Sequence, residues 1–423
     1  MAAIGLLALI AWAMYYDRSK TTMDPRFDHP WKLRTLHCLL IMTMTLVVVG
    51  QPVGEVSGPS SRFSFAVVLP KQGKILEWSG LCKQIELIRF MLNLKKARLH
   101  PGLSTEDLCF DGVPVRIYRP KAPSAGRRKG FVFFHGGAGM MGSIDYYQDV
   151  CSKLAKDSQT VLVSVGYRLS PEHPYPTQCE DCFAATVHFM KNSEVFGVDP
   201  SQIVIGGDSA GGNYASVIAQ KLVERPDLPR LRAQVLLYAG TQAMDFNLPS
   251  YQQNATMPLL FQDSVVFYGL KYFGKSTSLT EDLLIGSHVP DEIRLKCDKW
   301  MRPENLPERF LRRGFRQIPA VPCKPEVYEK LPEILSISFS SLFADDAVIR
   351  QLPETFVVTC EYDVLRDDSL LYKKRLEDNG VKVSWFHSEN GFHGVINCID
   401  LWFLTFPAGV EILDRAADFV RSL

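Results

Sequence analysis

After residue 100 the sequence alternates short apolar runs with helical stretches, and this alternation restricts the fold more than any other feature. The apolar runs are rich in Val, Ile and Phe, which is typical of strands buried on both faces of a sheet. They cover residues 114–120, 130–137, 160–168, 202–209, 233–240, 355–363 and 381–389. Amphipathic stretches such as GGNYASVIAQKLVER and GVEILDRAADFVRSL separate or follow them. The order predicts an α/β fold with a mostly parallel central sheet flanked by helices.

Residues of about 245–350 interrupt the alternation with several prolines and few strand signals. An insertion between late strands of such a sheet usually lies above their carboxyl ends, where open α/β sheets bind ligands. We therefore expect a catalytic domain over residues 106–423 with a helical cap inserted at about 245–350. Residues 18–105 would hold a second apolar segment and part of the cap, after an anchor at residues 1–17.

The charge balance excludes one class of partner. The chain has 423 residues and a formal net charge of +1, so it has no basic excess of the kind that nucleic-acid binding uses. With 46% hydrophobic residues it can bury a large core. No obligate protein partner is evident from the sequence.

Two apolar stretches lie near the N-terminus. Residues 1–16 carry no charge, and residues 35–53 contain only His37 as an ionisable group. As a helix, the first would be about 24 Å long, slightly short for a hydrocarbon core of about 30 Å. It lacks the early Lys or Arg and the small-residue cleavage site of a signal peptide, so we expect an uncleaved anchor and a lipid bilayer as partner.

The side of the membrane depends on how many stretches cross it. Five basic residues lie between the two stretches, and basic loops tend to stay cytosolic. Two crossings would place the remainder of the chain in the lumen, and one crossing would place it on the opposite side.

Two weak signals favour the lumen. Asn254-Ala255-Thr256 is the only glycosylation sequon, and the ten cysteines are compatible with an oxidising compartment. Cys179 and Cys182 form a C-x-x-C pattern, but their segment is predicted to be helical, and there this spacing stacks two buried thiols. We therefore expect a structural role for this pair.

Residues 207–211 read Gly-Asp-Ser-Ala-Gly and fit the G-x-S-x-G pattern at a predicted junction of strand and helix. In this setting a strained turn exposes the serine oxygen, and the glycines keep the neighbouring chain from clashing with it. The strand before, the helix after and an upstream His-Gly-Gly run favour a nucleophile elbow over an ordinary tight turn. Ser209 is the predicted nucleophile.

A serine hydroxyl needs an adjacent base, which in turn needs a third group to orient it. Behind such an elbow, the chain order is serine, acid, histidine. Asp363 and His393 each follow the carboxyl end of a predicted strand, at the edge where Ser209 is expected. We predict that His393 is the acid and base and that Asp363 orients it. The alternatives are Asp367 and Asp368, which suit the start of the next helix, and His387, which lies inside a strand.

Residues 135–139 read His-Gly-Gly-Ala-Gly directly after a strand. Attack on a carbonyl creates an oxyanion, and each backbone N–H that binds it contributes about 2.7–4 kcal/mol to the transition state. Glycines let the backbone approach because no side chain stands in the way. We predict an oxyanion hole formed by His135, Gly136, Gly137 and Ala138 together with the N–H of Ala210.

The segments HGG, GDSAGGN, YRLSPEHPYPTQCEDC, EYDVLRDD and NGFHG resemble the hormone-sensitive-lipase branch of the α/β-hydrolases. Within that branch, the N-terminal apolar stretch, DHPWKLR and YDVLRDDSLLYKKRLEDNGV are most similar to the arylacetamide deacetylase-like proteins. The likeness covers residues 1–423. It implies an α/β-hydrolase in the endoplasmic-reticulum membrane with a luminal catalytic domain, which hydrolyses esters or amides of lipophilic acids.

The resemblance carries over to Ser209, Asp363, His393 and the His135–Gly137 motif. The family commonly has a third glycine where this chain has Ala138. Alanine keeps its N–H, so we expect the hole to survive if φ at Ala138 is negative.

The sequence thus predicts a membrane-anchored serine hydrolase that cleaves carboxylic esters or amides of lipophilic substrates through an acyl-enzyme. No metal or organic cofactor is implied. The alternative is a catalytically weak or inactive protein of the same fold that binds a hydrophobic ligand in the capped pocket. Ala138 is the residue that supports this alternative.

Overall fold

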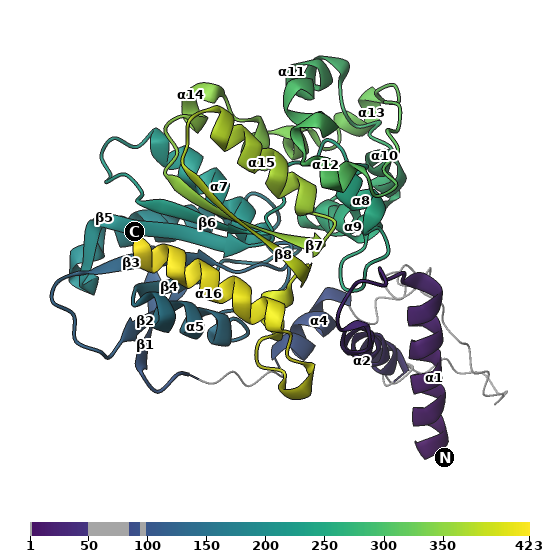
Figure 1. Cartoon of the computed structure of the whole chain (residues 1–423), viewed down its shortest axis with the longest axis horizontal. Coiled ribbons are helices and arrows are strands. Elements are labelled where there is room, and N and C mark those ends of the chain that lie inside the picture. Colours follow the sequence, from purple (N-terminus) through teal and green to yellow (C-terminus); the bar gives the residue numbers. More distant parts are fainter. Residues whose placement is uncertain (1, 50–83, 94–98) are drawn as a thin grey trace, which may run out of the picture. The chain divides into compact units, whose positions relative to one another are not determined.

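A central sheet of eight strands organises residues 96–423 (Figure 1). The computed structural model describes residues 2–49, 84–93 and 99–423. The strand order is β1-β2-β4-β3-β5-β6-β7-β8. The strands are β1 (Leu103–Phe110), β2 (Val113–Pro120), β3 (Arg128–Phe134), β4 (Val161–Val165), β5 (Val198–Asp208), β6 (Ala233–Leu237), β7 (Glu354–Tyr362) and β8 (Val383–Phe392).

The pairing of the strands is mostly parallel, as predicted. Strand β2 pairs antiparallel with β1 and β4, whereas β4, β3, β5, β6, β7 and β8 pair parallel in that order. All seven predicted strands are present. The prediction missed β1 because its sequence LSTEDLCF is largely polar, and most of its side chains are exposed.

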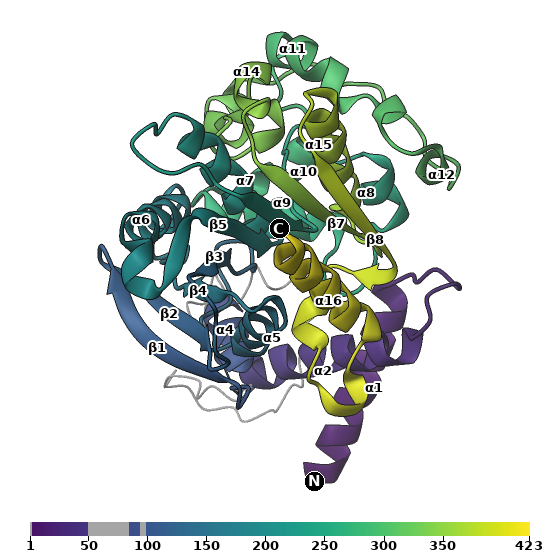
Figure 2. The same cartoon turned by 60° about the vertical axis from the view of Figure 1, so that its left-hand side comes forward.

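Helices cover both faces of the sheet (Figure 2). Helices α5 (Gln148–Ser158) and α16 (Pro407–Ser422) lie on one face, and α6 (Thr177–Asn192), α7 (Ala210–Val223) and α15 (Arg366–Asp378) lie on the other. Every residue of β4 and β6 is therefore buried, which explains their continuous apolar sequences. Cys179 and Cys182 are both free thiols, buried on α6.

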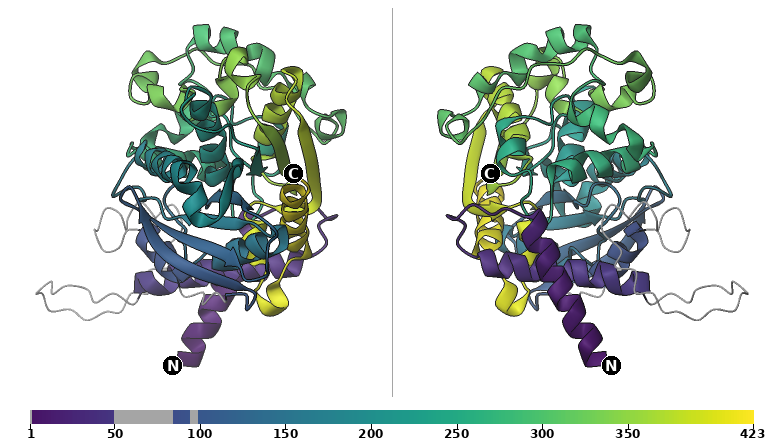
Figure 3. Two further views of the ribbon diagram at one scale, coloured as in Figure 1. Left: turned by 90° about the vertical axis from the view of Figure 1, so that its left-hand side faces the viewer. Right: turned by 90° about the vertical axis from the view of Figure 1, so that its right-hand side faces the viewer.

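The insertion between β6 and β7 is helical and lies at one end of this unit (Figure 3). It contains α8 (Pro249–Gln253), α9 (Gln262–Tyr272), α10 (Thr280–Leu284), α11 (Asp291–Met301), α12 (Glu308–Leu311), α13 (Pro325–Tyr328) and α14 (Asp346–Ile349). Helices α8 and α11 pack near α15, and α14 packs near α7. The insertion therefore covers flanking helices as well as the carboxyl edge of the sheet. Residues 54–83 and 94–98 of the expected cap lie outside the described residues.

Short 3₁₀ turns complete the unit. They are η2 (Ser193–Phe196), η3 (Thr277–Leu279), η4 (Pro303–Asn305), η5 (Pro332–Leu335), η6 (Ser341–Phe343), η7 (Val395–Cys398) and η8 (Trp402–Leu404).

Residues 1–95 form a separate unit with helices α1 (Ala2–Lys20), α2 (Pro30–Val49) and α4 (Gln84–Asn93). Asp17 joins the first two helices, because its carboxylate accepts hydrogen bonds from Arg34 and, at 2.8 Å, from Nδ1 of His37. None of the helices in the described part of the chain is both long and apolar enough to cross a membrane. Residues 50–53 of the second predicted apolar stretch lie outside the described residues.

Candidate active site

Ser209 stands at a strained turn between β5 and α7. Its φ of +54° and ψ of −121° are unusual for a residue with a side chain, and such strain clusters at functional sites. The flanking glycines are required by space: a Cβ on Gly207 would lie 2.3 Å from the carbonyl oxygen of Phe134, and one on Gly211 would lie 2.0 Å from it. The turn is therefore the predicted elbow, held close against the end of β3.

His393 connects Ser209 to Asp363. Its Nδ1 lies 2.9 Å from Oδ2 of Asp363, and its Nε2 lies 2.8 Å from Oγ of Ser209. A carboxylate only accepts hydrogen bonds, so Nδ1 carries the proton, and Nε2 presents its lone pair to the serine hydroxyl. The three side chains come from the ends of β5, β7 and β8, which the parallel sheet brings to one edge. The structure thus brings the predicted triad together.

The carboxylate of Asp363 is held firmly. It is 1% exposed, and its Oδ1 accepts a hydrogen bond of 2.9 Å from the N–H of Leu365. The ring of Tyr238 meets the His393 ring edge to face, with 5.2 Å between the centroids. These contacts fix the imidazole in the plane that both hydrogen bonds need.

The predicted oxyanion loop divides into two functional parts. The N–H of Gly136 donates to Oδ1 of Asp208 at 2.8 Å, so it is engaged and unavailable to an oxyanion. Nδ1 of His135 bonds to the carbonyl of Gly136 at 2.8 Å, and burial lowers the pKa of this imidazole to about 4. Of these two predicted members of the hole, Gly136 thus has its N–H engaged, and His135 uses its side chain to hold the loop.

Three N–H groups remain as candidate donors. Within residues 2–49, 84–93 and 99–423, the N–H groups of Gly137, Ala138 and Ala210 have no hydrogen-bond acceptor. Two belong to the glycine-rich loop, and the third is the first residue of α7, next to Ser209. Helix N-termini are favourable sites for negative charge.

Ala138 does not have the negative φ that the sequence analysis required. Its φ is +56°, between +110° at Gly137 and +67° at Gly139. A left-handed conformation costs an L-residue about 1–2 kcal/mol. The backbone of the loop therefore has the left-handed conformation that glycine adopts at low cost, and Ala138 adopts it with steric strain.

Asp208 is a site residue that the sequence analysis missed. It is 1% exposed and accepts hydrogen bonds from the N–H of Gly136 and, at 3.0 Å, from the hydroxyl of Tyr147. Burial raises the pKa of Asp208 to about 6. Its place beside the predicted nucleophile was visible in the G-x-S-x-G pattern, but its partner Gly136, 72 residues away in the sequence, was not.

The alternative acids have other partners. Asp367 accepts hydrogen bonds from Nε of Arg366 at 2.9 Å and from the N–H of Ser250 at 2.6 Å. Asp368 accepts a hydrogen bond from Gln242 at 2.9 Å. Both lie in the first turn of α15, as predicted, and both are fully buried.

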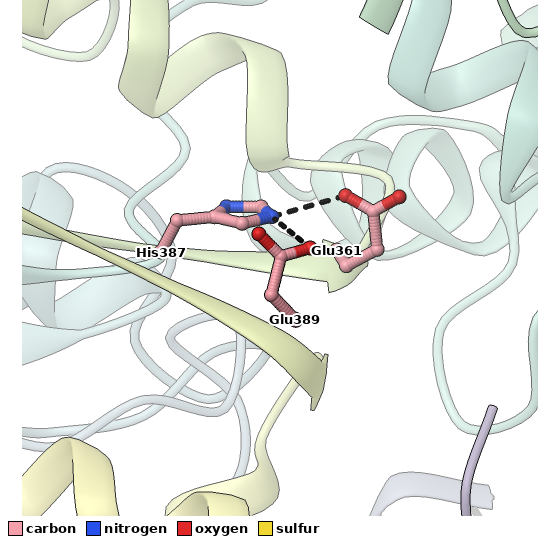
Figure 4. Close-up of side chains that lie close together, drawn as sticks. All are labelled: Glu361, His387 and Glu389. Atoms are coloured by element: carbon pink, nitrogen blue, oxygen red, sulfur yellow. Dashed lines mark hydrogen bonds and ion pairs between the residues drawn. The ribbon is translucent and has the colours of Figure 1, made fainter. Parts of the chain in front are cut away.

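The alternative histidine, His387, forms a second cluster with Glu361 and Glu389 (Figure 4). Its Nε2 lies 3.0 Å from Oε2 of Glu361 and 3.7 Å from Oε2 of Glu389. These are metal-ligand types, but Arg313 pairs with Glu361, and Arg309 pairs with Glu389 at 2.9 Å. Because the arginines already neutralise the carboxylates, the cluster is an ion-pair network.

Asn254 does not have the exposed position that glycosylation requires. It is 4% exposed, and its Nδ2 donates to the carbonyl oxygens of Asp363 at 3.1 Å and Glu361 at 3.2 Å. A glycan on this nitrogen would replace one of its two hydrogens and remove at least one of these bonds, and the buried position leaves no room for it. The expected glycosylation is therefore incompatible with this structure.

Comparison with known proteins agrees with this fold and site. Residues 131–286 and 329–397 match the family model of the α/β-hydrolase fold. Arylacetamide deacetylase-like 3 of Homo sapiens is 41% identical over 422 residues, which cover 100% of this chain and 97% of that protein. Arylacetamide deacetylase of Bos taurus is 41% identical over 302 residues, covering 70% of this chain and 75% of that protein.

Among solved structures, the hyperthermophilic esterase of Pyrobaculum calidifontis matches with a TM-score of 0.59 and 26% identity. The match covers 84% of this chain and 97% of the esterase. The identity with arylacetamide deacetylase-like 3, which extends over the whole chain, and the match to the family model indicate the same family. The chain belongs to the arylacetamide deacetylase-like proteins, in the hormone-sensitive-lipase branch of the α/β-hydrolases.

Proposed function

We propose that this protein is a serine hydrolase that cleaves carboxylic esters or amides of lipophilic substrates through an acyl-enzyme. The observation that carries the proposal is the continuous hydrogen-bonded chain from Ser209 through His393 to Asp363. A nucleophile, a base and an orienting acid at these distances are what acyl transfer requires.

In the first half of the reaction, Oγ of Ser209 attacks the substrate carbonyl and its proton passes to Nε2 of His393. The carbonyl oxygen becomes an oxyanion, which the N–H groups of Gly137, Ala138 and Ala210 are available to bind. The tetrahedral intermediate then collapses: the bond to the leaving alcohol or amine breaks, and His393 returns the proton to it.

In the second half, a water molecule attacks the acyl-enzyme. His393 takes a proton from the water, a second oxyanion forms in the same hole, and the bond to Oγ of Ser209 breaks. The carboxylic acid leaves, and Ser209 regains its proton from His393. Asp363 stays ionised throughout and stabilises the imidazolium in both halves.

The relatives support a lipophilic ester or amide as substrate. Arylacetamide deacetylases are named for hydrolysis of an amide, and the Pyrobaculum protein is an esterase. A series of p-nitrophenyl esters below their micelle concentrations measures the preference. If the pocket holds a long acyl chain, kcat/KM rises with chain length, because each buried methylene contributes up to about 0.8 kcal/mol. A fall from acetate onward would indicate a small-acyl deacetylase.

We also propose that residues 1–17 anchor the protein to the endoplasmic-reticulum membrane with the catalytic unit in the lumen. The uncharged residues 1–16 and the family resemblance support this proposal. In intact microsomes the catalytic unit should resist added protease and become sensitive after detergent. Digestion without detergent would contradict the luminal orientation.

A hydrophobic-ligand-binding protein without activity is the second candidate, and the left-handed φ of Ala138 favours it. A fluorophosphonate probe separates the two. A competent Ser209 becomes covalently labelled, and the label is absent from Ser209→Ala. A folded wild-type protein that stays unlabelled and hydrolyses no ester would contradict the proposed function.

A further inference from the structure

Helix α8 of the insertion is bonded to one segment of the catalytic unit, residues 361–368. This segment begins in β7, contains Asp363 and enters α15. Four residues at or near the end of α8 contribute side-chain bonds to it: Ser250, Tyr251, Gln253 and Asn254. We call residues 361–368 the acid segment.

The first three contacts hold the distal part of the acid segment. Oγ of Ser250 donates to the carbonyl of Val364 at 2.6 Å. The hydroxyl of Tyr251 donates to Asp368 at 3.2 Å. Oε1 of Gln253 accepts a hydrogen bond of 2.9 Å from the fully buried guanidinium of Arg366.

Asn254 makes the contact nearest to the triad. Its amide nitrogen bridges the carbonyl oxygens of Glu361 and Asp363, at 3.2 and 3.1 Å. It thereby fixes the main chain on both sides of Tyr362, at the point where β7 ends. The backbone N–H of Asn254 donates to the carbonyl of Ser250 at 3.0 Å. Helix α8 therefore fixes the position from which the side-chain amide reaches the acid segment. Both of its donors are used inside the protein.

We propose that Asn254 is a positioning residue that sets the orientation of Asp363, and that α8 thereby couples the insertion to the triad. The proposal rests on the proposed function, in which Asp363 orients His393. The proposal also explains why the asparagine of the sequon is buried: its side-chain amide donates hydrogen bonds to the backbone of the acid segment.

Loss of the amide would leave two buried carbonyl groups with weaker partners and loosen the backbone of Asp363. Small misplacements of a catalytic group can cost about a hundredfold in rate. The Asp363–His393 bond would weaken, so the imidazolium that forms during the attack would be less stabilised. Because the neutral imidazole is the active form, the acidic limb of the kcat/KM profile would move to lower pH.

The test compares Asn254→Ala and Asn254→Ser with Asn247→Ala in the full-length protein. Asn247 is a matched control, since its amide donates to the carbonyl of Leu284, a residue of the same insertion. We expect kcat to fall about 10- to 100-fold in Asn254→Ala with little change in KM, and the acidic limb to shift to lower pH. Asn254→Ser keeps one donor and should fall in between. The control should retain wild-type kinetics.

Two results would overturn the positioning role of Asn254. A kcat within twofold of wild type and an unmoved acidic limb in Asn254→Ala would overturn the positioning role. An equal loss in Asn247→Ala would overturn it too, because the effect would then be general to the insertion. If Asn254→Ala does not fold, the same two readouts on Asn254→Ser decide. Wild type and Ser209→Ala are measured in parallel, and equal activity in those two would contradict the proposed function itself.

Discussion

Strands β7 and β8 carry two histidine–carboxylate–hydroxyl arrangements only a few residues apart, and just one of them includes the nucleophile of the proposed reaction. At the strand ends, His393 bonds to Asp363 and Ser209. Within the strands, Nε2 of His387 lies 3.0 Å from Glu361, and its Nδ1 lies 2.8 Å from Oγ1 of Thr359. The distances are nearly the same in both arrangements.

The difference lies in what surrounds the hydroxyl and the imidazole. Thr359 is fully buried in β7, and its Oγ1 also accepts a hydrogen bond of 2.9 Å from Trp385. Burial lowers the pKa of His387 to about 4, and the positive charge of Arg309, Arg366 and Arg313 acts in the same direction. Ser209 instead stands on an elbow directly before Ala210, whose N–H, like those of Gly137 and Ala138, has no acceptor among the described residues. Geometry among three side chains is therefore insufficient without access and oxyanion donors.

The sharpest test of this comparison removes each hydroxyl. Ser209→Ala should lower kcat by about 10⁴- to 10⁶-fold and abolish fluorophosphonate labelling. It deletes one oxygen and should leave the melting temperature nearly unchanged. Thr359→Ala is the matched control and should keep its labelling rate. Hydrolysis near the wild-type rate in Ser209→Ala would contradict the assignment of Ser209 as the nucleophile.

The next largest effect comes from the carboxylates. Asp363→Asn should lower kcat by about 10⁴-fold, because an amide no longer fixes the tautomer of His393. Asp367→Asn, Asp368→Asn and Glu361→Gln should act mainly on the melting temperature, since they disturb buried polar networks away from His393. Esterase assays and thermal melts of the four variants separate the effects. Equal losses of kcat in all four would mean that the acid is misassigned.

A smaller effect should follow from Ala138→Gly in the oxyanion loop. Glycine adopts the observed φ of +56° without a Cβ, so the change should stabilise the fold by up to about 1 kcal/mol. We also expect kcat to rise several-fold. Gly139→Ala is the opposing control, because its Cβ would lie 2.4 Å from Tyr272. A lower melting temperature and a lower kcat in Ala138→Gly would show that the alanine is favourable there.

The smallest effect on activity is expected from His387→Gln, which should leave kcat near pH 7.5 within about threefold of wild type. Its effect on stability should depend on pH. The folded pKa of about 4 lies below the reference value of 6.5, so the unfolded chain binds the proton more readily between these values. Wild type should thus lose up to about 3 kcal/mol as the pH falls from 6.5 to 4.

Denaturant titrations across this range give the measurement for His387. The variant should lack this part of the acid sensitivity and should show a flatter dependence of the unfolding free energy on pH. The same slope in variant and wild type would assign the acid sensitivity to other groups.

The sequence alone determined the strand–helix alternation, the elbow and the order of the triad. These features depend on local patterns: apolar runs define buried strands, and side chains that directly follow parallel strands meet at one edge of a sheet. For the same reason His387 was correctly placed inside a strand. The polar edge strand β1 lacked such a pattern and was missed.

Only the tertiary structure decided which backbone and side-chain groups are already engaged. Asp208 accepts a hydrogen bond from the N–H of Gly136, 72 residues away in the sequence, and Asn254 bonds to Asp363 across 109 residues. Sequence spacing does not encode such partners, since a hydrogen bond depends on positions fixed to a fraction of an ångström by the packing of distant elements. The residue types therefore identified the chemistry, and packing determined which groups are free to perform it.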